Sequence, residues 1–228
     1  KIHQNLNFHL NKGESIALLG NSGTGKSVLL RSLIGLEDID QGEIYFNNQR
    51  IDHLSEEELY PIRTKISYAF QSGALFDSET VFDNLAYPLR EHSELTEGEI
   101  EEKVKDALEL VGMKDTQNLM PADLSGGMQK RVGLARSFIL GPDILLYDEP
   151  TAGLDPVNVL NVVKIMRNLQ KRGISSIFVT HDIPAALEAC DRILILNGGK
   201  IEIEGTPQEM LASDSPLVKS FFSGINPK

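Results

Sequence analysis

Two hydrophobic patterns alternate along this chain. Short apolar or alternating runs are too short for helices and suit buried strands. Between most of them, apolar residues recur three or four positions apart, as in helices with one buried face. The predicted strands are 6–10, 16–19, 42–46, 66–70, 144–147, 176–180, 192–196 and 200–203. This alternation predicts an α/β fold with a largely parallel sheet covered on both faces.

Residues 72–130 differ from the rest of the chain, because strand patterns are absent from 72 to 125. Within 97–112, apolar residues recur at helical spacing and predict one buried helix face. We therefore expect a mainly helical subdomain inside a single domain that covers 1–228.

Composition narrows the function classes only slightly. The chain has 228 residues and a formal net charge of −11, which argues against a nucleic-acid partner. Its single cysteine, Cys190, leaves no intrachain disulfide. No apolar run approaches the roughly 18 residues that a membrane span requires.

The segment Gly20–Ser27 fits the phosphate-loop pattern G-x-x-x-x-G-K-[ST], between a predicted strand and a helical pattern. Its glycines allow backbone N–H groups to turn toward phosphate oxygens. We expect Lys26 to reach the β- and γ-phosphates and the Ser27 hydroxyl to bind Mg²⁺. A glycine-rich turn that binds nothing is the less favoured alternative. The expected phosphate-binding residues are Gly20, Asn21, Ser22, Gly23, Thr24, Gly25, Lys26 and Ser27.

Polar side chains also follow three other predicted strands. Asp148 and Glu149 come after a run of four apolar residues, and Gln71 and His181 occupy equivalent places after 66–70 and 176–180. Ligands bind at the carboxyl edge of open α/β sheets. Adjacent strand residues point in opposite directions, so we expect Asp148 to face Mg²⁺ and Glu149 to polarise the attacking water.

A second predicted anion-binding helix start lies at Ser125-Gly126-Gly127, where Ser125 caps a helix that opens with two glycines. Taken alone, this pattern is more typical of an ordinary capped helix. Only the other motifs in the chain favour an anion-binding role for this helix start.

In this order, the motifs resemble the nucleotide-binding domain of an ABC transporter over essentially the whole chain. The matching segments are 20–27, Gln71, the signature at 124–129, the strand at 144–149, 153–155 and His181. The resemblance implies a P-loop NTPase fold of the ABC type, with an N-terminal antiparallel β portion, that hydrolyses ATP with Mg²⁺. It gives Glu149, His181 and Gln71 catalytic roles, and places Gln71 with Ser27 and Asp148 at the metal.

The resemblance further implies a head-to-tail homodimer with two composite sites. Ser125, Gly126 and Gly127 of one copy close over the ATP of the other, and Asp155 helps to join the copies. The family stacks adenine on an aromatic residue upstream of the phosphate loop. Phe8 has the pattern of a core residue, so we expect that aromatic ahead of Lys1, which is not a natural start.

A narrower resemblance lies in residues 70–77 and 81–91, which are similar to the ATPase subunit of MCE-type phospholipid transporters. It implies transmembrane permease subunits, a permease contact around 71–90, and an MCE-domain partner. It also implies a peripheral location at the cytoplasmic face of an inner membrane, with the plastid inner envelope as a second setting. Residues 215–228 resemble the beginning of a C-terminal extension.

Two alternatives stay open beside phospholipid transport. One is the ATPase of another importer or exporter, for amino acids or lipoproteins. The other is a soluble ABC protein of DNA repair or translation, which the acidic charge and the single compact domain disfavour.

Overall fold

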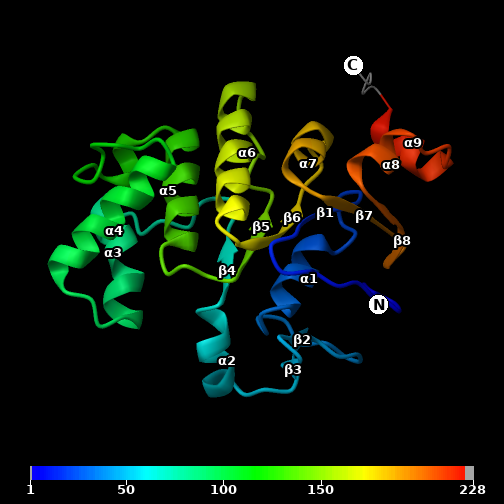
Figure 1. Ribbon diagram of the computed structural model, residues 1–228, viewed down its shortest axis with the longest axis horizontal. Coiled ribbons are helices and arrows are strands. Elements are labelled where there is room, and N and C mark those ends of the chain that lie inside the picture. The colour runs from blue at the N-terminus through cyan, green and yellow to red at the C-terminus, as the bar shows by residue number, and fades with distance from the viewer. Residues whose placement is uncertain (1, 224–228) are drawn as a thin grey trace.

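A six-stranded sheet runs through the centre of the computed structural model, which describes residues 2–223 (Figure 1). In spatial order the strands are β4 (Ile66–Ala69), β5 (Ile144–Asp148), β6 (Ser175–Val179), β1 (Ser15–Leu19), β7 (Arg192–Asn197) and β8 (Lys200–Gly205). The first five strands are parallel and β8 is antiparallel to β7. The predicted parallel sheet is therefore confirmed.

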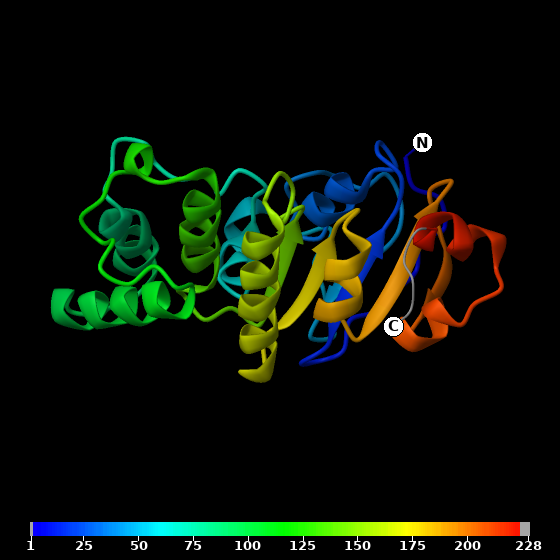
Figure 2. The same ribbon diagram turned by 90° about the horizontal axis from the view of Figure 1, so that it is seen from above.

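Helices cover both faces of this sheet, as Figure 2 shows with α6 and α7 on one side and α1 on the other. The period of two in the strands explains why. In β1, Ala17 and Leu19 join the apolar core beneath α6 and α7, whereas Ile16 and Leu18 join the core beneath α1. The helices are α1 (Lys26–Ser32), α2 (Glu56–Arg63), α3 (Val81–His92), α4 (Glu97–Leu110), α5 (Gly126–Phe138), α6 (Pro156–Lys171), α7 (Ile183–Ala189), α8 (Pro207–Leu211) and α9 (Pro216–Phe222), with a short 3₁₀ turn at Pro121–Asp123.

The stretch between β4 and β5 contains helices and no strand, as the hydrophobic pattern indicates. In both views α3, α4 and α5 lie together at one end of the molecule (Figures 1 and 2). Side chains of α3 such as Leu85 pack with Ile100 and Val104 of α4 in the same apolar core that α6 enters. None of the helices described in residues 2–223 has both the length and the apolar character to cross a bilayer.

The predicted strand at 6–10 is wrong. These residues pair with no strand, although Leu6, Phe8 and Leu10 are half-buried against the core and Asn7 and His9 are exposed. The alternation therefore marks burial of one face, and the ladder of backbone hydrogen bonds that defines a strand is missing.

The predicted strand at 42–46 is shorter than expected, because only Tyr45–Phe46 (β2) pairs, with Gln49–Arg50 (β3). The backbone N–H of Ile44 donates instead to the Asp52 carboxylate at 2.8 Å. This two-stranded sheet matches the expected N-terminal antiparallel β portion. Within 215–228, where we expect the beginning of an extension, Pro216–Phe222 form α9, and 224–228 lie outside the described residues.

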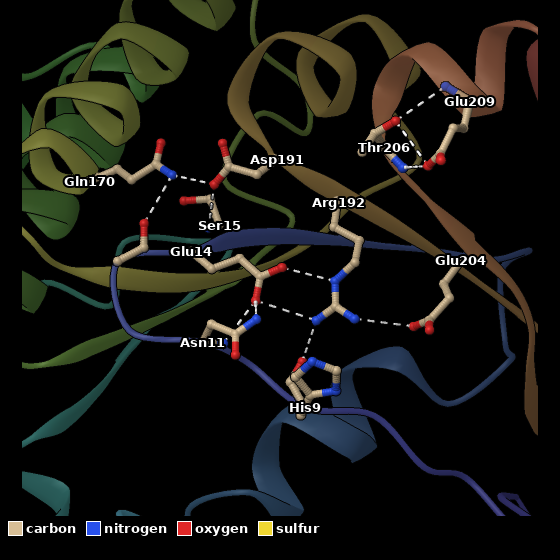
Figure 3. A network of polar contacts seen from close by, with 11 residues as sticks. His9, Asn11, Glu14, Ser15, Gln170, Asp191, Arg192, Glu204, Thr206 and Glu209 are labelled. Atoms are coloured by element: carbon tan, nitrogen blue, oxygen red, sulfur yellow. Dashed lines mark hydrogen bonds and ion pairs between the residues drawn. The ribbon is translucent and has the colours of Figure 1, made fainter.

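A network of polar contacts joins the first segment of the chain to β7 and β8 (Figure 3). The Arg192 guanidinium donates to the Glu14 carboxylate at 2.8 Å, to Glu204 at 3.2 Å and to the backbone oxygen of His9. Only 15% of the Arg192 side chain and 13% of the Glu14 side chain is exposed, so water screens this pair weakly.

Replacing Arg192 with methionine should lower the free energy of unfolding by about 2–3 kcal/mol, because a largely buried Glu14 carboxylate loses its charged partner. Urea denaturation followed by circular dichroism measures the loss. Lys219→Met is the control, since Lys219 and Asp214 form an exposed pair whose removal should cost less than about 1 kcal/mol. Equal losses of unfolding free energy in the two variants would contradict a stabilising role for the Arg192–Glu14 pair.

Candidate nucleotide-binding site

Four parallel strands bring the predicted polar residues to one edge of the sheet. The strands β4, β5, β6 and β1 are neighbours in this order, and their registers align Asp148 and Leu18 with Val179. The carboxyl ends of these adjacent strands are therefore followed, in the same order, by Gln71, Glu149, His181 and Gly20. The sheet order confirms that these four strand ends are neighbours.

The loop between β1 and α1 turns around the Lys26 side chain. Gly23 and Gly25 have φ angles of 81° and 90°, in the left-handed region that glycine adopts without a steric cost. The Lys26 ammonium donates to the backbone oxygens of Gly20 at 2.8 Å and Asn21 at 3.2 Å. Burial lowers the pKa of Lys26, while the Glu149 and Asp148 carboxylates raise it. The Lys26 side chain thus ends inside the loop.

Asp148 and Ser27 meet beside this loop. The Ser27 hydroxyl donates to one Asp148 carboxylate oxygen at 2.7 Å, and the Tyr68 hydroxyl donates to the other at 2.6 Å. Hydroxyl and carboxylate oxygens are the donors that Mg²⁺ prefers. The residues predicted for the metal from β5 and α1 are therefore in contact, and their chemistry fits the ion.

Tyr68 is a site residue that sequence reasoning missed. It belongs to β4, and its ring packs on Phe70 with ring centroids 4.6 Å apart. Burial and the hydrogen bond to Asp148 raise the pKa of Tyr68, so the phenol stays protonated and donates. No local pattern marks Tyr68, because its contact with Asp148 depends on the pairing of β4 with β5.

Tyr68→Phe should lower the apparent Mg²⁺ affinity in ATP hydrolysis by about 10-fold, because a group that orients a metal-binding carboxylate is lost. The measurement is the Mg²⁺ concentration at half-maximal rate. Tyr60→Phe serves as the control, since Tyr60 is exposed and bonds to His92. The same Mg²⁺ dependence in both variants would exclude this role for Tyr68.

Glu149 and His181 form a second pair at the sheet edge. The His181 Nδ1 atom lies 3.0 Å from a Glu149 carboxylate oxygen, and His181 is exposed whereas Glu149 is mostly buried. Glu149 has a φ of 52°, which is unusual for a residue with a side chain and marks a constrained position. Asp148 and Glu149 thus contact different groups. Glu149 lies beyond the end of β5, so its left-handed backbone, and not the strand alternation on which the prediction rested, sets its direction.

The remaining predicted residues lie around the starts of α5 and α6. The Ser125 side chain accepts from the Met128 N–H at 3.3 Å and caps α5. Asp155 caps α6 through the N–H groups of Val157 and Asn158. A β-carbon on Gly127 would approach the Asn158 side chain to 3.0 Å, so these two helix starts touch.

In both views α5, which begins at Gly126, lies with α3 and α4 at one end of the molecule, apart from α1, which follows the phosphate loop (Figures 1 and 2). Ser125 and Gly126 are exposed. Gln71 is also exposed, and its side chain forms no hydrogen bond within residues 2–223. Its catalytic and metal roles stay predictions.

Comparison with known proteins agrees with this geometry. The family model described as ABC transporter matches residues 3–152. The Escherichia coli K12 protein named intermembrane phospholipid transport system ATP-binding protein MlaF is 40% identical over 225 residues, which cover 98% of this chain and 84% of that protein. A Mycobacterium tuberculosis protein named probable ribonucleotide transport ATP-binding protein mkl is also 40% identical, over 98% of this chain and 63% of its own length.

A solved structure gives the same result for the fold. The dimeric post-hydrolysis state of the ATP-binding cassette MJ0796, bound to ADP and Pi, matches with a TM-score of 0.84 and 31% identity. The match covers 90% of this chain and 90% of that one.

Proposed function

This chain belongs to the ABC transporter family, and from that membership we propose that it hydrolyses ATP to power phospholipid transport between envelope membranes. The 40% identity to MlaF along 98% of the chain is the observation that supports phospholipid as the cargo. The geometry that carries the ATPase activity is the set of Lys26, Ser27, Asp148, Glu149 and His181 at one sheet edge.

In the proposed mechanism, residues 20–27 hold the phosphates of ATP and Lys26 neutralises negative charge on them. Ser27 and Asp148 would hold Mg²⁺ with the help of Gln71, and the ion would supply charge stabilisation at the transferred phosphoryl group. Glu149 accepts the hydrogen bond of the attacking water and orients it. His181, within hydrogen-bond distance of Glu149, fixes that carboxylate and faces the γ-phosphate.

A second copy completes each site. We infer that Ser125, Gly126 and Gly127 of one chain cover the ATP held by 20–27 of the other, and that Asp155 contacts the partner copy. The exposure of Ser125 and Gly126 supports this arrangement, as does the position of α5 away from α1 in Figure 1. On this proposal 72–130 acts as a helical subdomain that moves Ser125 onto the nucleotide.

The proposed partners are transmembrane permease subunits and an MCE-domain protein, with this chain peripheral at the cytoplasmic face of the inner membrane. Three exposed aromatic side chains support a permease contact around 71–90. Phe70, Phe76 and Tyr87 are 47%, 45% and 51% exposed. The relatives named above are bacterial and give no support to a plastid location.

Affinity purification of the tagged chain from its own cells tests the partners, and recovery of a permease and an MCE-domain protein is the expected result. The purified assembly, reconstituted in vesicles, should then transfer labelled phosphatidylglycerol in an ATP-dependent manner, and the same assembly with Glu149→Gln should not. ATP-dependent movement of a labelled ribonucleotide instead would favour the second candidate cargo, which the equal identity to mkl raises.

A further inference from the structure

Lys130 connects α5 to the turn that follows Glu149. It lies in the second turn of α5, three residues after Gly127, and is partly buried. Its ammonium group donates to the backbone oxygen of Ala152. A lysine has three donors and four rotatable bonds, so holding its side chain partly buried in one contact costs conformational entropy and desolvation. We expect that cost where the contact has a structural or functional role.

The turn that Lys130 binds begins at Glu149 itself. The Ala152 N–H donates back to the Glu149 backbone oxygen at 3.1 Å, and the Glu149 N–H donates to Val179 of β6 at 3.0 Å. These bonds fix Glu149 in its left-handed conformation, with a φ of 52°. A residue in this region holds its conformation only when its surroundings enforce it. The Lys130 contact anchors the far end of that turn.

The charge of Lys130 also acts at Glu149. Burial lowers the pKa of Lys130, and the Glu149 carboxylate raises it, so the two groups interact electrostatically. The Arg131 guanidinium, next along α5, points away and donates to the backbone oxygens of Val111 and Gly112. Of these two neighbouring cations, Lys130 is the one engaged with the 149–152 turn.

We propose that Lys130 is a positioning residue for ATP hydrolysis, which holds the 149–152 turn so that the Glu149 carboxylate stays aimed at the attacking water. The inference rests on the proposed role of Glu149. It adds that the helix carrying Ser125–Gly127 also carries the support for the hydrolytic carboxylate of its own chain.

Steady-state ATP hydrolysis by the full chain tests this role. Lys130→Met should lower kcat by about 10- to 100-fold, because a small displacement of a catalytic group has an effect of this size. The KM for ATP should stay within about threefold, since Lys130 does not touch the phosphate loop. Lys130→Arg keeps a cationic donor and should recover most of the rate. Lys164→Met, at an exposed position on α6, is the matched control and should behave as the parent does.

A double variant separates positioning of Glu149 from a merely structural role. If Lys130 acts through Glu149, then Lys130→Met in a Glu149→Gln background should change the residual rate by less than about twofold. That double variant should still form the ATP-bound dimer, measured by sedimentation. If Lys130→Met fails to fold in a thermal scan, Lys130→Gln takes its place in the same comparisons.

Four outcomes would overturn the proposal. These are an unchanged kcat in Lys130→Met, no recovery by Lys130→Arg, a further large loss of rate in the Glu149→Gln background, and loss of the ATP-bound dimer. Full activity of Glu149→Gln alone would instead refute the proposed function of Glu149, and so the two failures are distinguishable.

Discussion

Glu149→Gln is expected to lower kcat for ATP hydrolysis by about 100- to 10,000-fold while ATP binding persists, because an amide is a far weaker proton acceptor than a carboxylate. The change is nearly isosteric, so the left-handed turn at 149–152 and the contact with His181 can remain. Lys26, Ser27 and Asp148 are untouched, and the nucleotide keeps its contacts.

Single-turnover hydrolysis measures the slower rate, and sedimentation in the presence of ATP reports whether the variant still binds the nucleotide. The variant should accumulate as an ATP-bound dimer, since slow hydrolysis prevents reopening. Glu102→Gln is the control, because Glu102 is an exposed residue of α4. Hydrolysis by Glu149→Gln at the parental rate would show that another group polarises the water.

Lys26→Ala is expected to weaken ATP binding by about 100-fold, which corresponds to roughly 2–3 kcal/mol for charged hydrogen bonds to phosphate. Two effects combine. The positive charge inside the loop disappears, and the bonds to the backbone oxygens of Gly20 and Asn21 that define the loop's curvature disappear with it.

Isothermal titration with a non-hydrolysable ATP analogue measures this affinity. The control is Lys12→Ala, at an exposed position in the turn before β1, which should bind as the parent does. An unchanged affinity in Lys26→Ala would mean that residues 20–27 do not bind the phosphates. A thermal scan of each variant separates loss of binding from loss of folding.

The sequence predicts the fold correctly where a single local property, such as hydrophobicity, backbone freedom or helix capping, determines the conformation. The run Ile144–Tyr147 is apolar throughout and too short for a typical helix, and a strand buried on both faces accommodates it. The glycines at 23 and 25 adopt the positive φ angles that the phosphate-loop pattern requires. At Ser55, a residue pattern of Ser followed three positions later by Glu58 is typical of a capping box, and that box forms and starts α2.

The prediction of a strand at 6–10 is wrong because alternation of apolar and polar residues indicates burial of one face and not backbone pairing with another strand. Leu6, Phe8 and Leu10 do face the core, but strand formation also needs a neighbouring edge with free backbone groups, and that depends on tertiary structure. Tyr68 was missed for a related reason. Its hydroxyl matters only because β4 and β5 are adjacent and bring it to Asp148, and strand order is not written in local pattern.

Lys130 shows the same limit at longer range. Nothing in the spacing of residues 125–131 indicates that its ammonium reaches Ala152, since that contact depends on how α5 packs beside the turn after β5. The loop at 20–27, by contrast, is local in sequence and could be predicted from the sequence alone. Its dependence on a second chain came only from family resemblance.

On the proposed function, the loop at 20–27 is half of a site that Ser125–Gly127 of another copy completes. Mixing two variants tests it directly, each in the Glu149→Gln background. Lys26→Ala keeps an intact signature and Ser125→Arg keeps an intact loop, so neither alone should dimerise with ATP. Together they should sediment as a dimer that holds one ATP per two chains. A mixture that stays monomeric, or a Ser125→Arg protein that dimerises alone, would contradict the composite site.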